Sequence, residues 1–198
     1  MATSSCSRVE CVGIVSDSFY FEALETTTDV FMDSFNINTR SCRAYWVRSK
    51  DNKFLLIDHE QQFRAQNLTS QQLCQPECKF KIQVYTDFED VHGDKKTPAM
   101  LYVKNDDKIM VACCRGETEV YPEQMEALPT RIESNKHKAL FFMSELTAAH
   151  TYEFESSEYP SWFLGFQRDR ENPSKNELVL LHKCEDEVDE SCQVILCN

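Results

Sequence analysis

From Ala44 to the C-terminus, short apolar or alternating runs recur every ten to fifteen residues, with turn-forming residues between them. This rhythm is typical of all-β sandwiches and barrels, whose short strands follow one another through tight turns. The clearest run is 79–84, in which Phe80, Ile82 and Val84 alternate with polar residues. Because a period of two directs successive side chains to opposite faces, one face of this strand should be buried. The chain is therefore predicted to be all-β.

Twelve strands can be placed in this part of the chain. They are predicted at 44–47, 54–58, 63–67, 80–85, 99–103, 108–114, 118–121, 140–145, 152–156, 162–166, 178–182 and 192–196. Three groups of four strands, each about fifty residues long, suit a β-trefoil of about twelve strands. In that fold six strands close a barrel and six form hairpins that cap it. A jelly roll or another sandwich fits the same periodicity, so the residues alone leave that alternative open.

The N-terminal residues differ in character from the rest of the chain. Residues 11–33 contain five acidic side chains and no Lys or Arg. The first residues show no apolar segment of the kind found in secretory signals, so we expect a leaderless protein made in the cytosol. No apolar run is long enough to span a bilayer, and membrane insertion is not expected. These features predict a detachable acidic propeptide over 1–33 and a β-trefoil domain over 34–198.

Composition argues against several classes of function. The chain has 33 Asp and Glu against 21 Lys and Arg, a formal net charge of -12. Such a charge repels polyanions, so nucleic acid is not an expected partner. Four glycines are too few and too scattered for a loop that cradles phosphate groups. The five histidines lie far apart and no serine sits in a nucleophile elbow. We predict no enzymatic activity and no cofactor.

Ten cysteines are many for a cytosolic chain, but their spacing does not suggest a disulfide framework. Cys74 and Cys78 could join Cys113 and Cys114 in a zinc site, since zinc favours closely spaced thiolates. Adjacent residues of one strand point to opposite faces, however, so the last two cannot both reach one metal. No metal site is predicted, and we expect reduced, mostly structural thiols.

A thiol enzyme is a further hypothesis. His182 and Cys184 would share one face of a strand, close enough for the imidazole to lower the thiol pKa. The alternative, a strand end that enters a polar loop, is the preferred interpretation.

Residues 154–166 carry the most specific pattern in the chain. They predict a strand, a tight corner at Tyr159-Pro160 and a second strand. The segment resembles the interleukin-1 family signature at Phe154, Ser156, Ser157, Pro160, Phe163 and Leu164. It departs from that signature at Gly165 and Phe166, where the family more often has Ser, Cys or Ala followed by Thr.

Further segments are similar to interleukin-18 within that family. Residues 54–58, 108–114, 140–142 and 178–181, the last followed by an acidic loop at 185–190, occur in the same order at similar spacing. The resemblance covers residues 42–196 and is loosest from 88 to 138. It implies a monomeric, pro-inflammatory β-trefoil cytokine. Its implied partners are the interleukin-18-type receptor α and β chains and a soluble interleukin-18-binding protein.

The resemblance also implies an inactive cytosolic precursor that an inflammatory caspase cuts before unconventional release from the cell. Caspases need Asp before the cut and prefer a small residue after it, which Asp33 and Ser34 provide. Asp29 is less suitable because the β-branched Val30 follows it. We expect the acidic leader to block receptor binding until it is removed.

Similarity to the family places receptor contacts at Arg43, Arg48, Asp51, Asn52 and Leu68. A guanidinium such as that of Arg48 can pair bidentately with a receptor carboxylate. Leu68 is expected to be an exposed apolar anchor. The alternative function is another β-trefoil binding module, a protease inhibitor or a lectin. An inhibitor would need a rigid exposed loop, and a lectin would need a sugar site repeated in each third of the chain.

Overall fold

The computed structural model describes residues 9–15, 18–23, 35–38, 43–87, 96–105, 107–146, 148, 150–184 and 187–197. The chain divides into two units, residues 1–32 and 33–198, and each is described by itself. Asp33 and Ser34, the predicted cleavage residues, lie outside the described residues.

The first unit contains a β-hairpin that the sequence interpretation did not include. Strand β1 (Val9–Val15) pairs antiparallel with β2 (Ser18–Ala23), with a register irregularity between Cys11 and Gly13. These strands fall within the segment that was predicted to be an acidic propeptide.

The second unit is built from strands that run antiparallel to their neighbours. Its twelve main strands are β4 (Ala44–Arg48), β5 (Phe54–Ile57), β6 (Phe63–Gln66), β7 (Phe80–Asp87), β8 (Thr97–Asn105), β9 (Lys108–Arg115), β10 (Glu119–Met125), β12 (Phe141–Glu145), β13 (Thr151–Ser156), β14 (Trp162–Arg168), β15 (Asn176–His182) and β16 (Val194–Cys197). Shorter elements are β3 (Phe35–Ile37), β11 (Arg131–Ile132), helix α1 (Ser70–Leu73) and the 3-10 helices η1 (Pro76–Cys78) and η2 (Glu190–Cys192). Each of the twelve predicted strands overlaps one of the main strands, so that prediction is confirmed.

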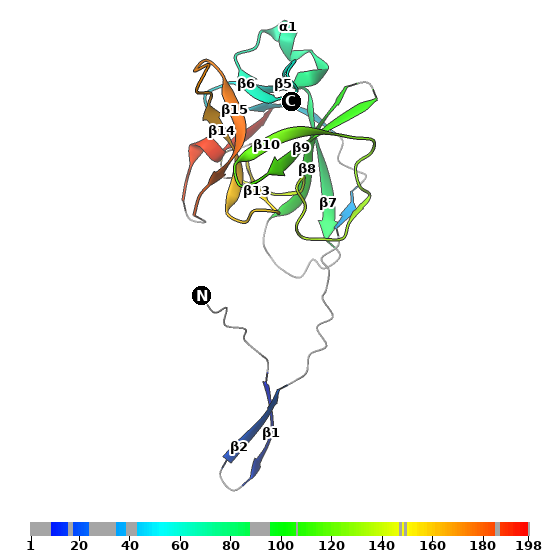
Figure 1. Cartoon of the computed structure of the whole chain (residues 1–198), viewed down its shortest axis with the longest axis vertical. Helices are drawn as coiled ribbons and strands as arrows, with labels where there is room; N and C mark the ends of the chain where they lie inside the picture. Colours follow the sequence, from blue (N-terminus) through cyan, green and yellow to red (C-terminus); the bar gives the residue numbers. More distant parts are fainter. Residues whose placement is uncertain are drawn as a thin grey trace. The chain divides into compact units, whose positions relative to one another are not determined.

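Six of these strands close a barrel. The pairings run β4–β7, β7–β8, β8–β12, β12–β13, β13–β16 and back from β16 to β4. The other six form three hairpins, β5–β6, β9–β10 and β14–β15, whose strands are labelled in Figure 1. Strand β15 pairs with both β6 and β10. This is the β-trefoil arrangement. A closed ring of strands excludes the sandwich alternative, because a sandwich consists of two separate sheets.

The barrel interior follows the predicted alternation only in part. Phe80 and Ile82 on β7 are buried in the main core, as expected. Val84 is only half-buried, whereas Gln83 on the opposite face is buried. The Gln83 amide donates to the Asn38 carbonyl at 2.7 Å and to the Val84 carbonyl at 2.9 Å. The outer face of β7 is thus covered by the β3 segment, and a buried amide is tolerated there because it is hydrogen-bonded.

A second apolar cluster lies on that outer face. Its buried members are Phe35, Tyr85, Met100, Tyr102, Val111, Cys113, Ile132, Ala139 and Leu140. Strand β3 pairs with both β7 and β11, and the Tyr85 hydroxyl donates to the Pro129 carbonyl at 2.9 Å. Strand β3 and the segment between β10 and β12 therefore pack on the outer faces of β7, β8 and β9 and form a second core outside the barrel.

The signature segment forms the predicted strand, corner and strand. Phe154 on β13 and Leu164 on β14 are fully buried. At the corner, the Ser156 hydroxyl accepts a hydrogen bond from the Tyr159 backbone N–H at 3.2 Å. The buried Ser157 hydroxyl donates to the His137 carbonyl at 3.0 Å. The two buried serines therefore satisfy backbone groups at the corner, which is a structural role.

Gly165, one of the two departures from the signature, lies where β14 meets η2. A Cβ at this position would lie 2.5 Å from Leu181 Cδ1 and 3.0 Å from the Ser191 carbonyl oxygen. We expect Gly165→Ala to lower the free energy of unfolding by about 1–3 kcal/mol, the range for overpacking a dense interior. Urea denaturation measures the loss, with Gln167→Ala at an exposed position of the same strand as the control. Equal stability of the two variants would show that Leu181 moves aside freely.

Candidate functional site

The turn between β4 and β5 brings three of the predicted contact residues together. Arg48 ends β4, and its Nη1 donates to Asn52 Oδ1 at 2.6 Å. Asn52 has a φ of 61°, a left-handed conformation that asparagine adopts more readily than most residues. The turn is closed by the Ser49 N–H, which donates to the Lys53 carbonyl at 2.9 Å. Asp51 and Asn52 are exposed, so the turn presents polar groups to solvent in a fixed geometry.

Leu68 lies at the same end of the sheet as this turn. Arg48 pairs with Phe54, and Phe54 pairs with Gln66. Because β5 and β6 are antiparallel, the residue two positions beyond Gln66 is level with the residue two positions before Phe54, which is Asn52. Leu68 is half-buried, so only part of its side chain is accessible at the surface.

Helix α1 follows Leu68 and lies against β4. The helix begins at Thr69, whose hydroxyl accepts from the Gln72 N–H, while the Gln72 side chain accepts from the Thr69 N–H. This capping box is visible in the sequence as Thr-x-x-Gln. The Trp46 indole N–H on β4 donates to the Leu73 carbonyl at 2.8 Å. The helix is thereby held beside the strand that carries Arg48.

Arg43 is not part of this group. It is exposed and precedes β4, whereas Arg48 is the last residue of that strand. Five residues of extended chain span about 16 Å. The structure therefore separates Arg43 from the other four predicted contact residues.

The Arg48 guanidinium is constrained on one edge. Its Nε is buried and has no hydrogen-bond partner among the described residues. A buried donor without an acceptor is unfavourable, and the covered Nε cannot take part in a side-on pair with a carboxylate. The end of the guanidinium, where Nη1 already contacts Asn52, is the edge that a partner carboxylate could approach.

Two long-range contacts at the β4–β5 turn were missed by sequence reasoning. Lys50 forms an ion pair with Glu190 of η2, and Lys53 Nζ donates to Asn176 Oδ1 at 2.7 Å. A hollow of about 170 Å³ lies here, lined by Ser49, Lys50, Asp51, Phe166, Asn176, Glu190 and Ser191. These residues come from three distant parts of the chain, so no local pattern could have joined them. The candidate surface therefore includes the β15–β16 connection.

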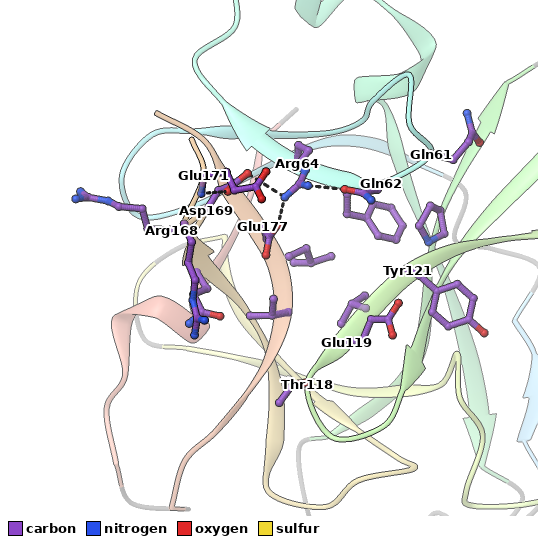
Figure 2. Close-up of a pocket in the computed structure, with 17 residues that line it drawn as sticks. Gln61, Gln62, Arg64, Thr118, Glu119, Tyr121, Arg168, Asp169, Glu171 and Glu177 are labelled. Carbon is purple, nitrogen blue, oxygen red and sulfur yellow. Dashed lines mark hydrogen bonds and ion pairs between the residues drawn. The ribbon is translucent and has the colours of Figure 1, made fainter. Parts of the chain in front are cut away.

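A larger hollow of about 610 Å³ lies between the three hairpins that cap the barrel. Figure 2 shows Arg64 beside Asp169 and Glu177 on one wall, with Glu119 and Tyr121 on another. Its lining includes one buried apolar residue from each hairpin, Phe63, Val120 and Leu178. The lining contains neither cysteine nor histidine, so it does not assemble the groups of a thiol enzyme.

Four of the described cysteines lie in buried environments that favour the neutral thiol. Burial raises the pKa of Cys78 to about 11 and the pKa values of Cys113, Cys114 and Cys192 to about 12. The side chain of Cys113 belongs to the outer cluster and that of Cys114 to the barrel core, so the predicted opposite orientation is confirmed. Catalytic thiols need the reverse shift.

The remaining hypothesis for a reactive thiol concerned Cys184. The His182 ring contacts Trp162 edge-on, with ring centroids 5.3 Å apart.

Within the described residues, no group of three or more His, Cys, Asp or Glu side chains is arranged to hold a metal ion. None of the helices in the described ranges has the length and apolar character that crossing a membrane requires.

Residues 69–191, more than half of the chain, match the model of the family described as Interleukin-1 / 18. The chain belongs to the interleukin-1 family. The resemblance in the signature segment is thereby confirmed, and the inhibitor and lectin alternatives are set aside.

Individual relatives within the interleukin-1 family are distant. Mouse interleukin-18 is 26% identical over 170 residues, which cover 85% of this chain and 83% of that protein. Interleukin-1β of the dog is 23% identical over 143 residues, covering 71% of this chain and 50% of that protein. Interleukin-1β of the pig is 25% identical over 164 residues and is covered over 57% of its length. The chain thus spans only about half of the interleukin-1β relatives that it matches.

Solved structures agree on the fold. The crystal structure of chicken interleukin-1β has a TM-score of 0.57 at 17% identity, covering 83% of this chain and 99% of that one. A hydrophobic-cavity mutant of chicken interleukin-1 has a TM-score of 0.58 with the same identity and coverage. At this identity the likeness supports the β-trefoil fold alone.

Membership in the interleukin-1 family makes this protein a cytokine. Cytokines of this family are signalling proteins. The candidate surface at the β4–β5 turn is accordingly considered as a protein-binding surface.

Proposed function

We propose that this interleukin-1 family member is an interleukin-18-like, pro-inflammatory cytokine. The observation that carries the proposal is the length of the alignment with mouse interleukin-18, which covers more than four fifths of both chains. The interleukin-1β relatives are matched over only 50% and 57% of their lengths. The acidic loop after β15 and the segments shared along the chain support the same assignment.

In this proposal the protein is made in the cytosol as an inactive precursor. An inflammatory caspase cuts after Asp33, and the product leaves the cell and brings together two immunoglobulin-like receptor chains of the interleukin-18 type. A soluble interleukin-18-binding protein would compete for the same cytokine. The domain acts as a monomer and works through its surface.

The proposed receptor surface contains the β4–β5 turn and the neighbouring Leu68. Three features support it: Arg48 has one guanidinium edge near solvent, Asp51 and Asn52 are exposed, and the turn is fixed by its hydrogen bonds. Arg43 lies at the other end of β4, so we assign it a contact that is separate from that of Arg48.

Charge reversal at Arg48 tests this surface. We expect Arg48→Glu to weaken binding to the interleukin-18-type receptor α ectodomain about tenfold or more, because a receptor carboxylate would then face a like charge. Surface plasmon resonance on the caspase-treated protein measures the change. Arg168→Glu, at an exposed arginine of β14, is the matched control for the change in net charge. Equal binding by both variants would remove Arg48 from the receptor contact.

A further inference from the structure

Lys183 is a cation placed in the interior of the domain. The residue is only 4% exposed and directly follows β15. Its Nζ lies 2.9 and 2.8 Å from the two Glu153 carboxylate oxygens, and it donates to the Glu187 carbonyl at 3.1 Å. The ammonium also lies over the Phe163 ring, 4.6 Å from its centroid. A buried charge is tolerated only when it is paired and hydrogen-bonded, and Lys183 meets both conditions.

These contacts fix the start of the β15–β16 connection. The Lys183 backbone N–H donates to the Ser161 carbonyl at 3.1 Å, which ties it to the β13–β14 corner. The Glu187 N–H donates to the Cys184 carbonyl at 3.1 Å, and the Cys184 N–H donates to the Glu187 carboxylate at 3.2 Å. Both backbone polar groups of Glu187 are therefore hydrogen-bonded, its N–H to the Cys184 carbonyl and its carbonyl to the Lys183 ammonium.

The connection then continues from this anchor to the β4–β5 turn. Asp189 caps η2 by accepting from the Ser191 N–H at 2.8 Å. Glu190, the first residue of η2, forms the ion pair with Lys50. Val188, between Glu187 and Asp189, is a large apolar side chain that is 80% exposed. A well-anchored segment therefore presents an apolar side chain flanked by acidic groups next to the candidate surface.

We propose that Lys183 is a positioning residue for partner recognition: its ammonium, held by Glu153 and Phe163, binds the Glu187 carbonyl and so fixes residues 187–190 beside the β4–β5 turn. The inference rests on the proposed receptor-binding function and extends it. The surface so formed combines the exposed Val188 with Glu187, Asp189 and Glu190, and it fits a partner face with an apolar recess bordered by basic groups.

The test removes the contacts of Lys183 with Glu153 and the Glu187 carbonyl without leaving a buried charge. Lys183→Met alone strands the Glu153 carboxylate and is expected to destabilise the fold strongly. The double variant Lys183→Met with Glu153→Met removes both charges, and such replacements are often neutral for stability. Lys183→Arg retains the cation. Lys96→Met is the matched control, because Lys96 pairs with Glu155 on the same strand at 2.9 Å but at a more exposed position.

Two readouts are measured on the full chain and on the caspase-treated chain. We expect the double variant to keep a near-native Tm, to exchange the hydrogen-bonded backbone amides of Glu187, Ser191 and Cys192 at least tenfold faster, and to bind the receptor α ectodomain about tenfold more weakly. Lys183→Arg should recover most of the binding, and Lys96→Met should change neither readout.

The two readouts separate this inference from the proposed function. Unchanged amide exchange in the double variant would overturn the positioning role, as would faster exchange with unchanged receptor binding. If the wild-type protein itself does not bind the receptor, the proposed function fails and the recognition role of Lys183 fails with it. In that case amide exchange still decides whether Lys183 orders the segment.

Discussion

Treatment of the full chain with an inflammatory caspase is expected to convert an inactive precursor into a signalling cytokine whose first residue is Ser34. Asp33 meets the requirement for aspartate before the cut, and Ser34 supplies the small residue after it. The described domain begins immediately afterwards with Phe35, which is 3% exposed and pairs with β7 and β11. A cut at this bond would therefore release the acidic leader and leave every described element from β3 onward in the product.

N-terminal sequencing of the product and a receptor-reporter assay measure the two parts of this prediction. Asp33→Ala should abolish both the cut and the gain in signalling, which we expect to be at least a hundredfold. Asp29→Ala is the matched control, four residues away in the same leader, and should leave both unchanged. Signalling by the uncut chain at full strength would show that the leader does not restrain the cytokine.

The main strands could be predicted because their determinants are local. A period of two along five or more residues, bounded by Asn, Asp or Pro, depends only on neighbours in sequence. The run containing Phe80 and Ile82 forms β7, and the segment from Phe154 to Leu164 forms β13 and β14 around a corner. The number and grouping of strands suited a closed barrel but also fitted a sandwich, and it was the family resemblance that favoured the β-trefoil.

Elements that depend on distant partners could not be predicted in this way. Strands β3 and β11 have three and two residues, too few for a periodic pattern, and they form because β3 pairs with both β7 and β11. Lys53 and Asn176 are 123 residues apart and bond directly. The interior position of Lys183 is similarly invisible, because its partner Glu153 lies on another strand.

The part of the candidate surface that lies in the β4–β5 turn could be predicted from the sequence. Arg48 and Asn52 are four residues apart, and the hairpin between them brings their side chains into contact. Arg43 was grouped with them through family similarity, but strand geometry places it at the other end of β4. The contribution of Glu190 through Lys50 required the folded chain.

Replacement of Arg64 by methionine is expected to have the largest effect on the stability of the cap. The Arg64 side chain is 15% exposed and lies among three carboxylates. Its Nη1 is 3.2 Å from Asp169 Oδ2 and contacts Glu177, while Nε is 3.7 Å from Asp58 Oδ2. Burial acts to lower the pKa of Arg64, but the hydrogen bond and charge of Glu177 and the other carboxylates outweigh it and raise the pKa.

Arg64 joins two turns of the cap through these contacts. Asp58 accepts from the Gln62 N–H at 3.0 Å in the β5–β6 turn. Asp169 accepts from the Glu171 N–H at 2.8 Å and from the Asn172 N–H at 3.1 Å in the β14–β15 turn. Without the guanidinium, three partly buried carboxylates would face one another with no cation between them. We therefore expect Arg64→Met to lower the free energy of unfolding by about 3 kcal/mol at neutral pH.

The loss should depend on pH in a defined direction. Hydrogen bonds from Asn172 and Glu171, followed by the charge of Arg64, lower the pKa of Asp169. A carboxyl whose folded pKa is lowered stabilises the fold above its unfolded pKa of about 3.9, and that contribution disappears as the pH falls through the folded pKa. In the variant, protonation instead relieves repulsion between the carboxylates. The stability gap between wild type and Arg64→Met should therefore narrow as the pH is lowered from 7 towards 3.

Urea denaturation at several pH values measures this gap, and Arg168→Met serves as the matched control. Arg168 lies on β14, is exposed, and has no ion pair with the residues that the structure describes. Its replacement should change stability by less than about 0.5 kcal/mol at any pH, as is usual for surface positions. A gap that stays constant with pH would mean that methionine costs stability through packing, because only the loss of a charge among carboxylates makes the effect depend on protonation.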